Sequence, residues 1–405
     1  MLPVDLPGTV RDALLAPLVD HHCHGVRRDD LGRAGFELLI SGAGSPAPPG
    51  TTHFDTPLGV AVRRWCGPLL DLEPHAPPAV YLARREELGA GEVNRRLLAG
   101  AGVVAFLVDS ASQDGELLSA TEMGRHGGAA ADELVRVEHI ERDVAASAQL
   151  AVDYLDDLGE QLTARAARAV GLKTVAGALY GLDLEGSRPA RGAVIAAANR
   201  RLADPKPPLT DPVLLHYLVW SAVDVARERG LPLQFHCGLG GGLGGGLGGG
   251  LGGGLGGGLE SRPGGGPLGE PHRADPARLS AFAGALQPLG VPMILLHSYP
   301  FHRQAAYLAA AFPHVYVDVG LAPPHTAAAA RVIDELLELA PFHKQLFGSG
   351  ACGLAETAYL GALTYRRALS RALATRIDSG EWSTADASRI AHMIGSGNAR
   401  RIYRL

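Results

Sequence analysis

Short runs of apolar and β-branched residues recur along the chain, and segments of helical periodicity lie between most of them. Turn-forming residues bound each run, which predicts a buried strand. Eight strands that alternate with helices indicate a parallel sheet, and eight is the number that closes a (β/α)8 barrel. An open doubly wound sheet is the alternative on this pattern alone. The predicted strands are 17–22, 103–109, 134–140, 170–176, 232–236, 292–297, 315–319 and 345–349, and the clearest helices are 211–229, 275–289, 300–312, 326–339 and 355–374.

The region after the first predicted strand interrupts this alternation. Residues 29–100 are rich in Ala, Arg and Glu, and their periodicity predicts helices at 60–70 and 79–99. We interpret this region as a helical insert in one barrel domain that spans residues 1–405 and closes with a helix at 384–402.

A glycine-rich tract follows the fifth predicted strand. Residues 238–269 contain 20 of the 54 glycines and repeat the unit Leu-Gly-Gly-Gly. A segment with so few side chains has no core of its own, which predicts a flexible loop over the barrel mouth. A mobile lid and a repeat that expanded under relaxed selection are both consistent with this position.

Charge and composition exclude several classes of partner. The formal net charge is −5, with 37 basic and 42 acidic residues and no basic block, which argues against nucleic acid or an anionic membrane surface as the main partner. No apolar run approaches the roughly 20 residues of a membrane span, and the N-terminus lacks the positive charge of an export signal. Four cysteines do not form a disulfide framework. We expect a cytoplasmic protein with a small-molecule substrate, and the sequence leaves open whether it forms a homodimer.

Histidines mark the carboxyl ends of three predicted strands. His22 and His24 end the first strand and share one face, because strand side chains alternate; His21 and Cys23 should point away from that face. Asp20 shares the face of His22 and His24, so it is a candidate to orient one of them.

His236 and His297 end the fifth and sixth strands. Since barrel active sites lie at the carboxyl ends of the strands, these four histidines should meet at one mouth. Such a cluster indicates a divalent metal, Zn²⁺ first, with Mn²⁺, Fe²⁺ and Ni²⁺ as alternatives. The chemistry that it favours is hydrolysis of an amide-like bond.

Other polar residues are predicted near the same mouth. Glu138 on the third strand is a candidate substrate-binding residue, and so are His302 and Arg303 just after the sixth strand. Asp109 and Asp318 end the second and seventh strands and are candidates without an assigned role. Cys352 is considered as a surrogate metal ligand, whereas Cys23 and Cys237 are expected to be inert core residues.

An ordered set of motifs, HHCHG, QFHCG, LLHSYPFHRQAAYLAAAFPHVYVDVGLA, LFGSGACGLAE and GNARRIYRL, resembles the amidohydrolase superfamily. The resemblance is strongest to an actinobacterial branch related to nodulin-like domains fused to glutamine-synthetase-like proteins. It implies a distorted TIM barrel in which His22, His24 and His236 hold the metal. It also implies that His297 is a ligand or an acid/base group, and that Lys173 on the fourth strand is a catalytic lysine, which some members carry as a carboxylated metal bridge.

The sequence departs from this family at several positions. The family ends its eighth strand with Ser-Asp, whose aspartate ligates the metal and deprotonates water, but here the pair is Ser349-Gly350. A glycine supplies neither an acceptor nor a base. Residues 177–179 and 238–241 also differ from the polar residues that the family carries there.

These departures leave three functions open. The first is a metal-dependent hydrolase of a C–N bond with an altered site, in which His297 polarises the substrate or shuttles the proton in place of the missing aspartate. The second is a metal-dependent decarboxylase or lyase of specialised metabolism. The third is a catalytically inactive barrel that binds a ligand.

Overall fold

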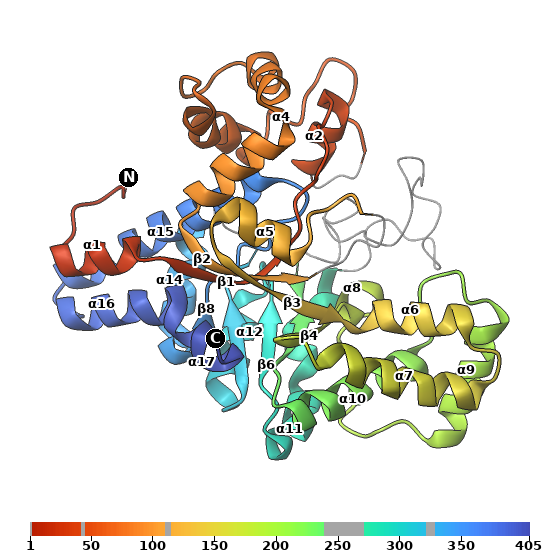
Figure 1. Cartoon of the computed structure of the whole chain (residues 1–405). Helices are drawn as coiled ribbons and strands as arrows, with labels where there is room; N and C mark the ends of the chain where they lie inside the picture. The colour runs from red at the N-terminus through yellow and green to blue at the C-terminus, as the bar shows by residue number, and fades with distance from the viewer. Residues whose placement is uncertain (1, 42–44, 110–114, 239–270, 321–328) are drawn as a thin grey trace.

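Eight parallel strands form one continuous sheet with helices between them, as Figure 1 shows for the computed structural model. The structure describes residues 2–41, 45–109, 115–238, 271–320 and 329–405. Each strand pairs with the next in chain order, from β1 to β8. The strands are β1 (Leu18–His24), β2 (Val103–Asp109), β3 (Ala130–Arg136), β4 (Gly171–Thr174), β5 (Leu233–His236), β6 (Met293–Leu296), β7 (Val315–Asp318) and β8 (Gln345–Leu346).

Backbone hydrogen bonds between β1 and the segment after β8 bring the two edges of the sheet together. The N–H of His21 donates to the carbonyl of Phe347 at 3.1 Å, and the N–H of His24 donates to that of Ala351 at 2.6 Å. The sheet is therefore a nearly closed barrel, which confirms the predicted (β/α)8 architecture over the open-sheet alternative.

Helices cover the outside of this barrel. Their buried positions recur at helical spacing, for example Tyr154, Leu158 and Leu162 on α7. The helices are α1 (Gly8–Leu15), α5 (Ala120–Gly127), α6 (Val137–Ser147), α7 (Ala151–Ala166), α8 (Ala176–Leu179), α9 (Arg191–Ala203), α10 (Pro212–Arg229), α11 (Ser280–Leu286), α12 (His302–Ala311), α14 (Ala329–Leu339), α15 (Ala355–Asp378), α16 (Thr384–His392) and α17 (Asn398–Tyr403). Shorter helical turns are η4 (Pro271–Ala274), η5 (Pro276–Leu279), η6 (Gln287–Leu289), η7 (Phe342–Lys344) and η8 (Met393–Gly397).

The third predicted strand, 134–140, is misplaced. β3 ends at Arg136, and α6 begins at Val137. The buried residues Val137, Ile140 and Val144 lie three and four apart, which is the spacing of a helix face. Glu138 therefore lies in the first turn of a helix rather than on a strand.

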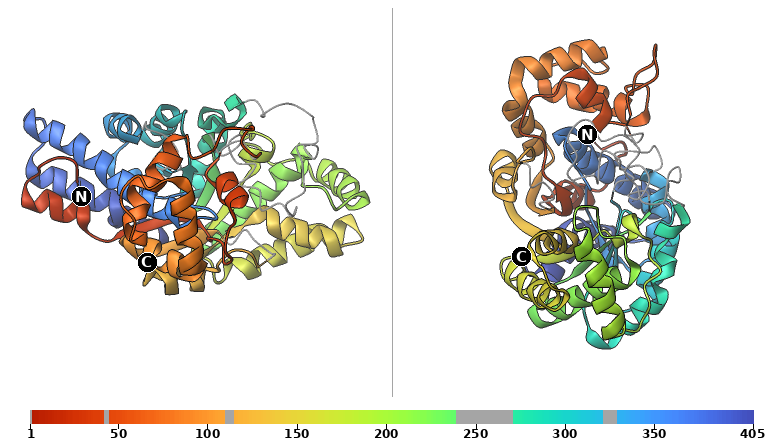
Figure 2. Two further views of the ribbon diagram at one scale, coloured as in Figure 1. Left: turned by 90° about the horizontal axis from the view of Figure 1, so that it is seen from above. Right: turned by 90° about the vertical axis from the view of Figure 1, so that its right-hand side faces the viewer.

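The predicted helical insert is present between β1 and β2. It contains α2 (Arg33–Leu39), α3 (Pro57–Ala61), η1 (Val62–Cys66), η2 (Gly67–Leu70) and α4 (Pro78–Gly100). Figure 1 shows it, in red and orange, at the top of the molecule, with α6, α7 and α9 at the lower right, and Figure 2 shows it from two further sides. The predicted helix 60–70 is instead a short α-helix followed by a π-helical and a 3₁₀ turn.

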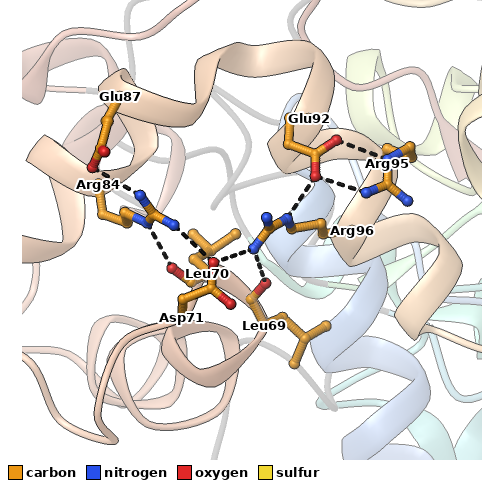
Figure 3. A network of polar contacts seen from close by, with 8 residues as sticks. All are labelled: Leu69, Leu70, Asp71, Arg84, Glu87, Glu92, Arg95 and Arg96. Carbon is orange, nitrogen blue, oxygen red and sulfur yellow. Dashed lines mark hydrogen bonds and ion pairs between the residues drawn. The ribbon is translucent and has the colours of Figure 1, made fainter.

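Two sets of ionic contacts fix this insert. Asp71, in a left-handed conformation at the end of η2, receives hydrogen bonds from Arg84 at 2.7 Å and Arg96 at 2.6 Å, both on α4 (Figure 3). Glu356 on α15 is fully buried. It accepts hydrogen bonds from Arg85 Nε at 2.7 Å and from the Tyr81 hydroxyl at 2.9 Å. The second set joins the insert to the barrel helices.

The interior of the barrel is apolar in its middle and is closed at the amino ends of the strands by α17. Val19, Leu107 and Ile294 pack there with Ile402 and Tyr403 of α17. In the part of the chain that is described, no helix is long and apolar enough to cross a membrane. The predicted glycine-rich loop, 238–269, lies outside the described residues apart from Gly238.

Candidate active site

Four histidine rings meet at the carboxyl ends of the strands. His22 and His24 come from β1, His236 ends β5, and His297 follows β6 directly. The ring centroids of His22 and His297 are 4.9 Å apart, and those of His22 and His24, and of His236 and His297, are each 5.1 Å apart. All four side chains are buried. The structure thus brings together the four residues that the sequence placed at one mouth.

The Lys173 ammonium lies among these rings. Its Nζ is 3.2 Å from His22 Nε2, 3.4 Å from His24 Nε2 and 2.8 Å from Asp109 Oδ2. Arg136 at the end of β3 binds the same Asp109 oxygen, with its Nε at 3.1 Å. Two buried cations therefore share one carboxylate, which the guanidinium and the ammonium keep ionised although burial opposes its charge. Its pKa lies well below the usual range.

Three of the four histidines favour the neutral form. Burial lowers the pKa values of His22, His24 and His297 well below the usual range, and the charge of Lys173 lowers them further. Burial also lowers the pKa of Lys173, to about 8, although Asp109 opposes this shift. Neutral imidazoles are the form that ligates metals.

The imidazole nitrogens of the cluster are ligands that suit a divalent transition metal. The Nδ1 atoms of His22 and His24 are buried and have no hydrogen-bond partner among the described residues, so each ring keeps coordination capacity. In their present positions, the side chains of the described residues do not bring three or more His, Cys, Asp or Glu into an arrangement that could hold a metal ion. Lys173 Nζ stands between the Nε2 atoms of His22 and His24, so the ammonium would have to yield to an ion that binds both rings.

Asp318 positions His297. Its Oδ1 accepts the backbone N–H of His297 at 2.9 Å, and its Oδ2 lies 3.1 Å from His21 Nε2. His297 has a φ of +56°, a left-handed conformation that is uncommon outside glycine. A Cβ on Gly320 would lie 2.5 Å from His297 Nδ1, so only glycine leaves room for this ring.

The alternation predicted along β1 fails at His21. Its Nδ1 lies 3.0 Å from the Tyr403 hydroxyl, which also accepts a hydrogen bond from Gln234 at 2.7 Å, so His21 joins a buried network instead of pointing away from the barrel. The pairing of β1 with β2 shifts between Asp20 and Cys23, which explains the change of face. Cys23 and Cys237 are buried, as expected.

Asp20 bonds Ser349 rather than a histidine. The Ser349 N–H and hydroxyl donate to its two oxygens at 2.8 and 2.6 Å. Burial raises the pKa of Asp20 to about 6 in spite of these bonds. The next residue, Gly350, has a φ of +59° and donates its N–H to the His22 carbonyl at 3.0 Å.

The predicted substrate-binding residues do not form one group. Glu138 Oε1 accepts hydrogen bonds from Thr174 Oγ1 and the Val175 N–H, and burial raises its pKa. His302 Nε2 pairs with Glu335 at 2.7 Å, and the exposed Arg303 lies 3.9 Å from the same carboxylate. Their roles toward a substrate stay predictions.

The sequence interpretation did not single out Arg136 and Tyr403. The signal for Arg136 was a charged residue at the end of an apolar run, where strand ends face the mouth. Tyr403 gave no comparable signal, because it reaches the barrel interior from the last helix. Cys352, the candidate surrogate ligand, lies close enough to Arg136 and Lys173 for their charges to affect its thiol. Burial nevertheless raises the pKa of that thiol to about 11.

Solved structures share this fold over nearly the whole chain. A putative metal-dependent hydrolase from Lactobacillus casei ATCC 334 superposes with a TM-score of 0.78 at 20% identity, covering 99% of this chain and 98% of that one. Uronate isomerase from Thermotoga maritima gives a TM-score of 0.63 at 13% identity, covering 98% and 97%. At these identities the similarity shows the fold.

Sequence comparison identifies the family. The chain is 31% identical over 136 residues to Protein fluG of Emericella nidulans, a match that covers 33% of this chain and spans only 16% of the length of fluG. The model of the family described as Amidohydrolase matches residues 73–405. Its members are generally dependent on divalent metal ions. Because that match takes in β2 to β8 together with Lys173, His236 and His297, the chain belongs to the amidohydrolase family.

Proposed function

We propose that this protein hydrolyses an amide-like C–N bond of a small molecule at a divalent metal centre. The observation that carries the proposal is the convergence of four buried histidines at the carboxyl ends of β1, β5 and β6. His22, His24 and His236 would hold the ion, with zinc as the first expectation. When bound, such an ion polarises a carbonyl group and acidifies water.

The remaining residues of the site position and transfer protons. His297 is neutral and is fixed by Asp318, so its imidazole can take a proton from the attacking water and return it to the leaving nitrogen. Asp109 holds Lys173 beside the histidines and is itself held by Arg136. This arrangement gives the site a carboxylate and two cations around the reacting atoms.

Gly350 favours a second candidate, a barrel that binds its ligand without hydrolysing it. No carboxylate stands at this position, and its backbone is left-handed and hydrogen-bonded to His22. Asp20 does not take over this role, because each of its two oxygens already accepts a hydrogen bond from Ser349.

Metal analysis of the purified protein tests the metal centre. We expect about one divalent ion per chain, lost in His22→Ala and His24→Ala and retained in His302→Ala, a histidine paired with Glu335. Wild-type protein that stays metal-free after incubation with Zn²⁺, Mn²⁺, Fe²⁺ and Ni²⁺ would overturn the proposal.

Gly350→Asp separates the two candidates, with Gly350→Asn as the matched control because Asn tolerates a left-handed backbone equally well and carries no charge. Wild-type hydrolysis of a panel of amides and lactams supports the first candidate. Hydrolysis that appears only in Gly350→Asp, and not in Gly350→Asn, supports the binding protein.

A further inference from the structure

A pocket lies at the amino ends of the strands, away from the histidines. It has a volume of about 210 Å³ and is formed by the end of α10, the segment before β6, Tyr316 of β7 and the last helix, α17. Figure 1 shows α17 at the C-terminus of the chain, close to β8.

Three arginines, Arg227, Arg401 and Arg404, line this pocket, and no acidic residue of the described ranges lines it. Arg401 donates one hydrogen bond, to the His343 carbonyl at 2.6 Å, and lies 5.9 Å from the centre of the Tyr316 ring. Within the described chain, the side chains of Arg227 and Arg404 have neither a hydrogen-bond acceptor nor an ion-pair partner. All three arginines are exposed to solvent, and no acidic side chain among the described lining residues offsets their charge.

The backbone allows these groups to gather. Gly230 ends α10 in a left-handed conformation with a φ of +65°. A Cβ at this position would lie 2.8 Å from both terminal nitrogens of Arg404, so glycine lets that guanidinium rest against the helix end. Arg404, with a φ of +58°, turns the chain at the end of α17.

We propose that this pocket binds a phosphate group, either inorganic phosphate or the phosphate of a small metabolite. Guanidinium groups present forked donors that match the oxygens of phosphate, and several of them around one anion relieve their mutual repulsion. The pocket is smaller than the 300–1,000 Å³ typical of sites for drug-sized ligands, which favours a phosphate on a short carbon skeleton over a nucleotide.

The position of the pocket links its occupant to the stability of the barrel. Arg401 and Arg404 lie on either side of the segment Ile402–Tyr403. The Tyr403 hydroxyl forms hydrogen bonds with His21 and Gln234 in the barrel interior. An anion that bridges α17 to the end of α10 holds the helix that closes this end of the barrel. Binding should therefore raise the melting temperature.

Isothermal titration of the full chain with inorganic phosphate, glycerol phosphate and succinate tests the proposal, with ionic strength held constant by NaCl because salt screens exposed charges. We expect one phosphate site whose affinity falls about tenfold or more in Arg227→Ala and in Arg404→Gln. Tighter binding of inorganic phosphate than of glycerol phosphate identifies the free ion as the ligand, and the reverse order identifies a phosphorylated metabolite.

Arg229→Ala and Arg400→Ala are the matched controls. Arg229 lies on α10 and Arg400 on α17, and both are exposed, as the pocket arginines are. Each substitution removes one positive charge, but neither residue lines the pocket. We expect both variants to bind as the wild type does. Equal loss in the control variants, unchanged affinity in the pocket variants, or a preference for succinate over both phosphates would overturn the proposal.

Discussion

The Asp318 carboxylate accepts a hydrogen bond from the backbone N–H of His297 at 2.9 Å and holds that residue in a left-handed conformation. Its second oxygen bonds His21, which in turn contacts Tyr403 of the last helix. One aspartate therefore joins the histidine cluster at the barrel mouth to the network at its other end.

Replacing Asp318 should destabilise the protein. In Asp318→Ala the buried N–H of His297 and the ring of His21 lose their acceptor, which should lower the free energy of unfolding by about 3 kcal/mol. Asp318→Asn keeps an oxygen for the N–H and should lose less than half as much. Urea unfolding measures both, and equal losses would contradict a role for the His297 hydrogen bond.

Removing Lys173 should strengthen metal binding. The Lys173 ammonium lies 3.2 and 3.4 Å from the Nε2 atoms of His22 and His24. Its positive charge repels a metal cation that binds between those rings. Lys173→Met should therefore bind Zn²⁺ about tenfold more tightly than the wild type, with Lys206→Met as a surface control. A weaker metal affinity in Lys173→Met would instead make Lys173 a ligand, as in the superfamily members with a carboxylated lysine.

Glu356 should anchor the helical insert. It is fully buried and pairs with Arg85 on α4, so Glu356→Gln leaves a buried guanidinium without its counter-charge. We expect a loss of about 3–5 kcal/mol in the free energy of unfolding and faster proteolysis within residues 45–100. Tyr81→Phe removes only a neutral donor to the same carboxylate and should cost about 1 kcal/mol. If both variants lose equally little, the ion pair does not hold the insert.

His139 should contribute to acid sensitivity. Burial, aided by the charge of Arg136, lowers the pKa of His139 to about 4. Between this value and its unfolded pKa of about 6.5 the unfolded chain binds more protons, so the contribution of His139 to stability falls as the pH drops through that window. His139→Gln should lose less stability than the wild type between pH 7 and pH 4.5, by about 2 kcal/mol. Parallel losses in urea unfolding at the two pH values would contradict this assignment.

The sequence by itself predicted the barrel and the histidine cluster, because both depend on local patterns. Apolar runs between helical segments predicted eight strands, and the rule that barrel sites gather at strand ends placed His22, His24, His236 and His297 together. It misplaced β3 because the run from Leu134 to Ile140 is short and suits a strand and a helix face equally well.

Only the tertiary structure decided which partner each buried polar group takes. Asp20 pairs with Ser349, His21 with Asp318 and Tyr403, and Lys173 with Asp109, although the members of most of these pairs lie far apart in the chain. Such pairing depends on the closure of the sheet and on the shift in β1, neither of which leaves a periodic trace in the sequence. The sequence determined which groups reach the barrel mouth, and the folded geometry determined which of them remain available for chemistry, because each buried charge must find its counter-charge in three dimensions.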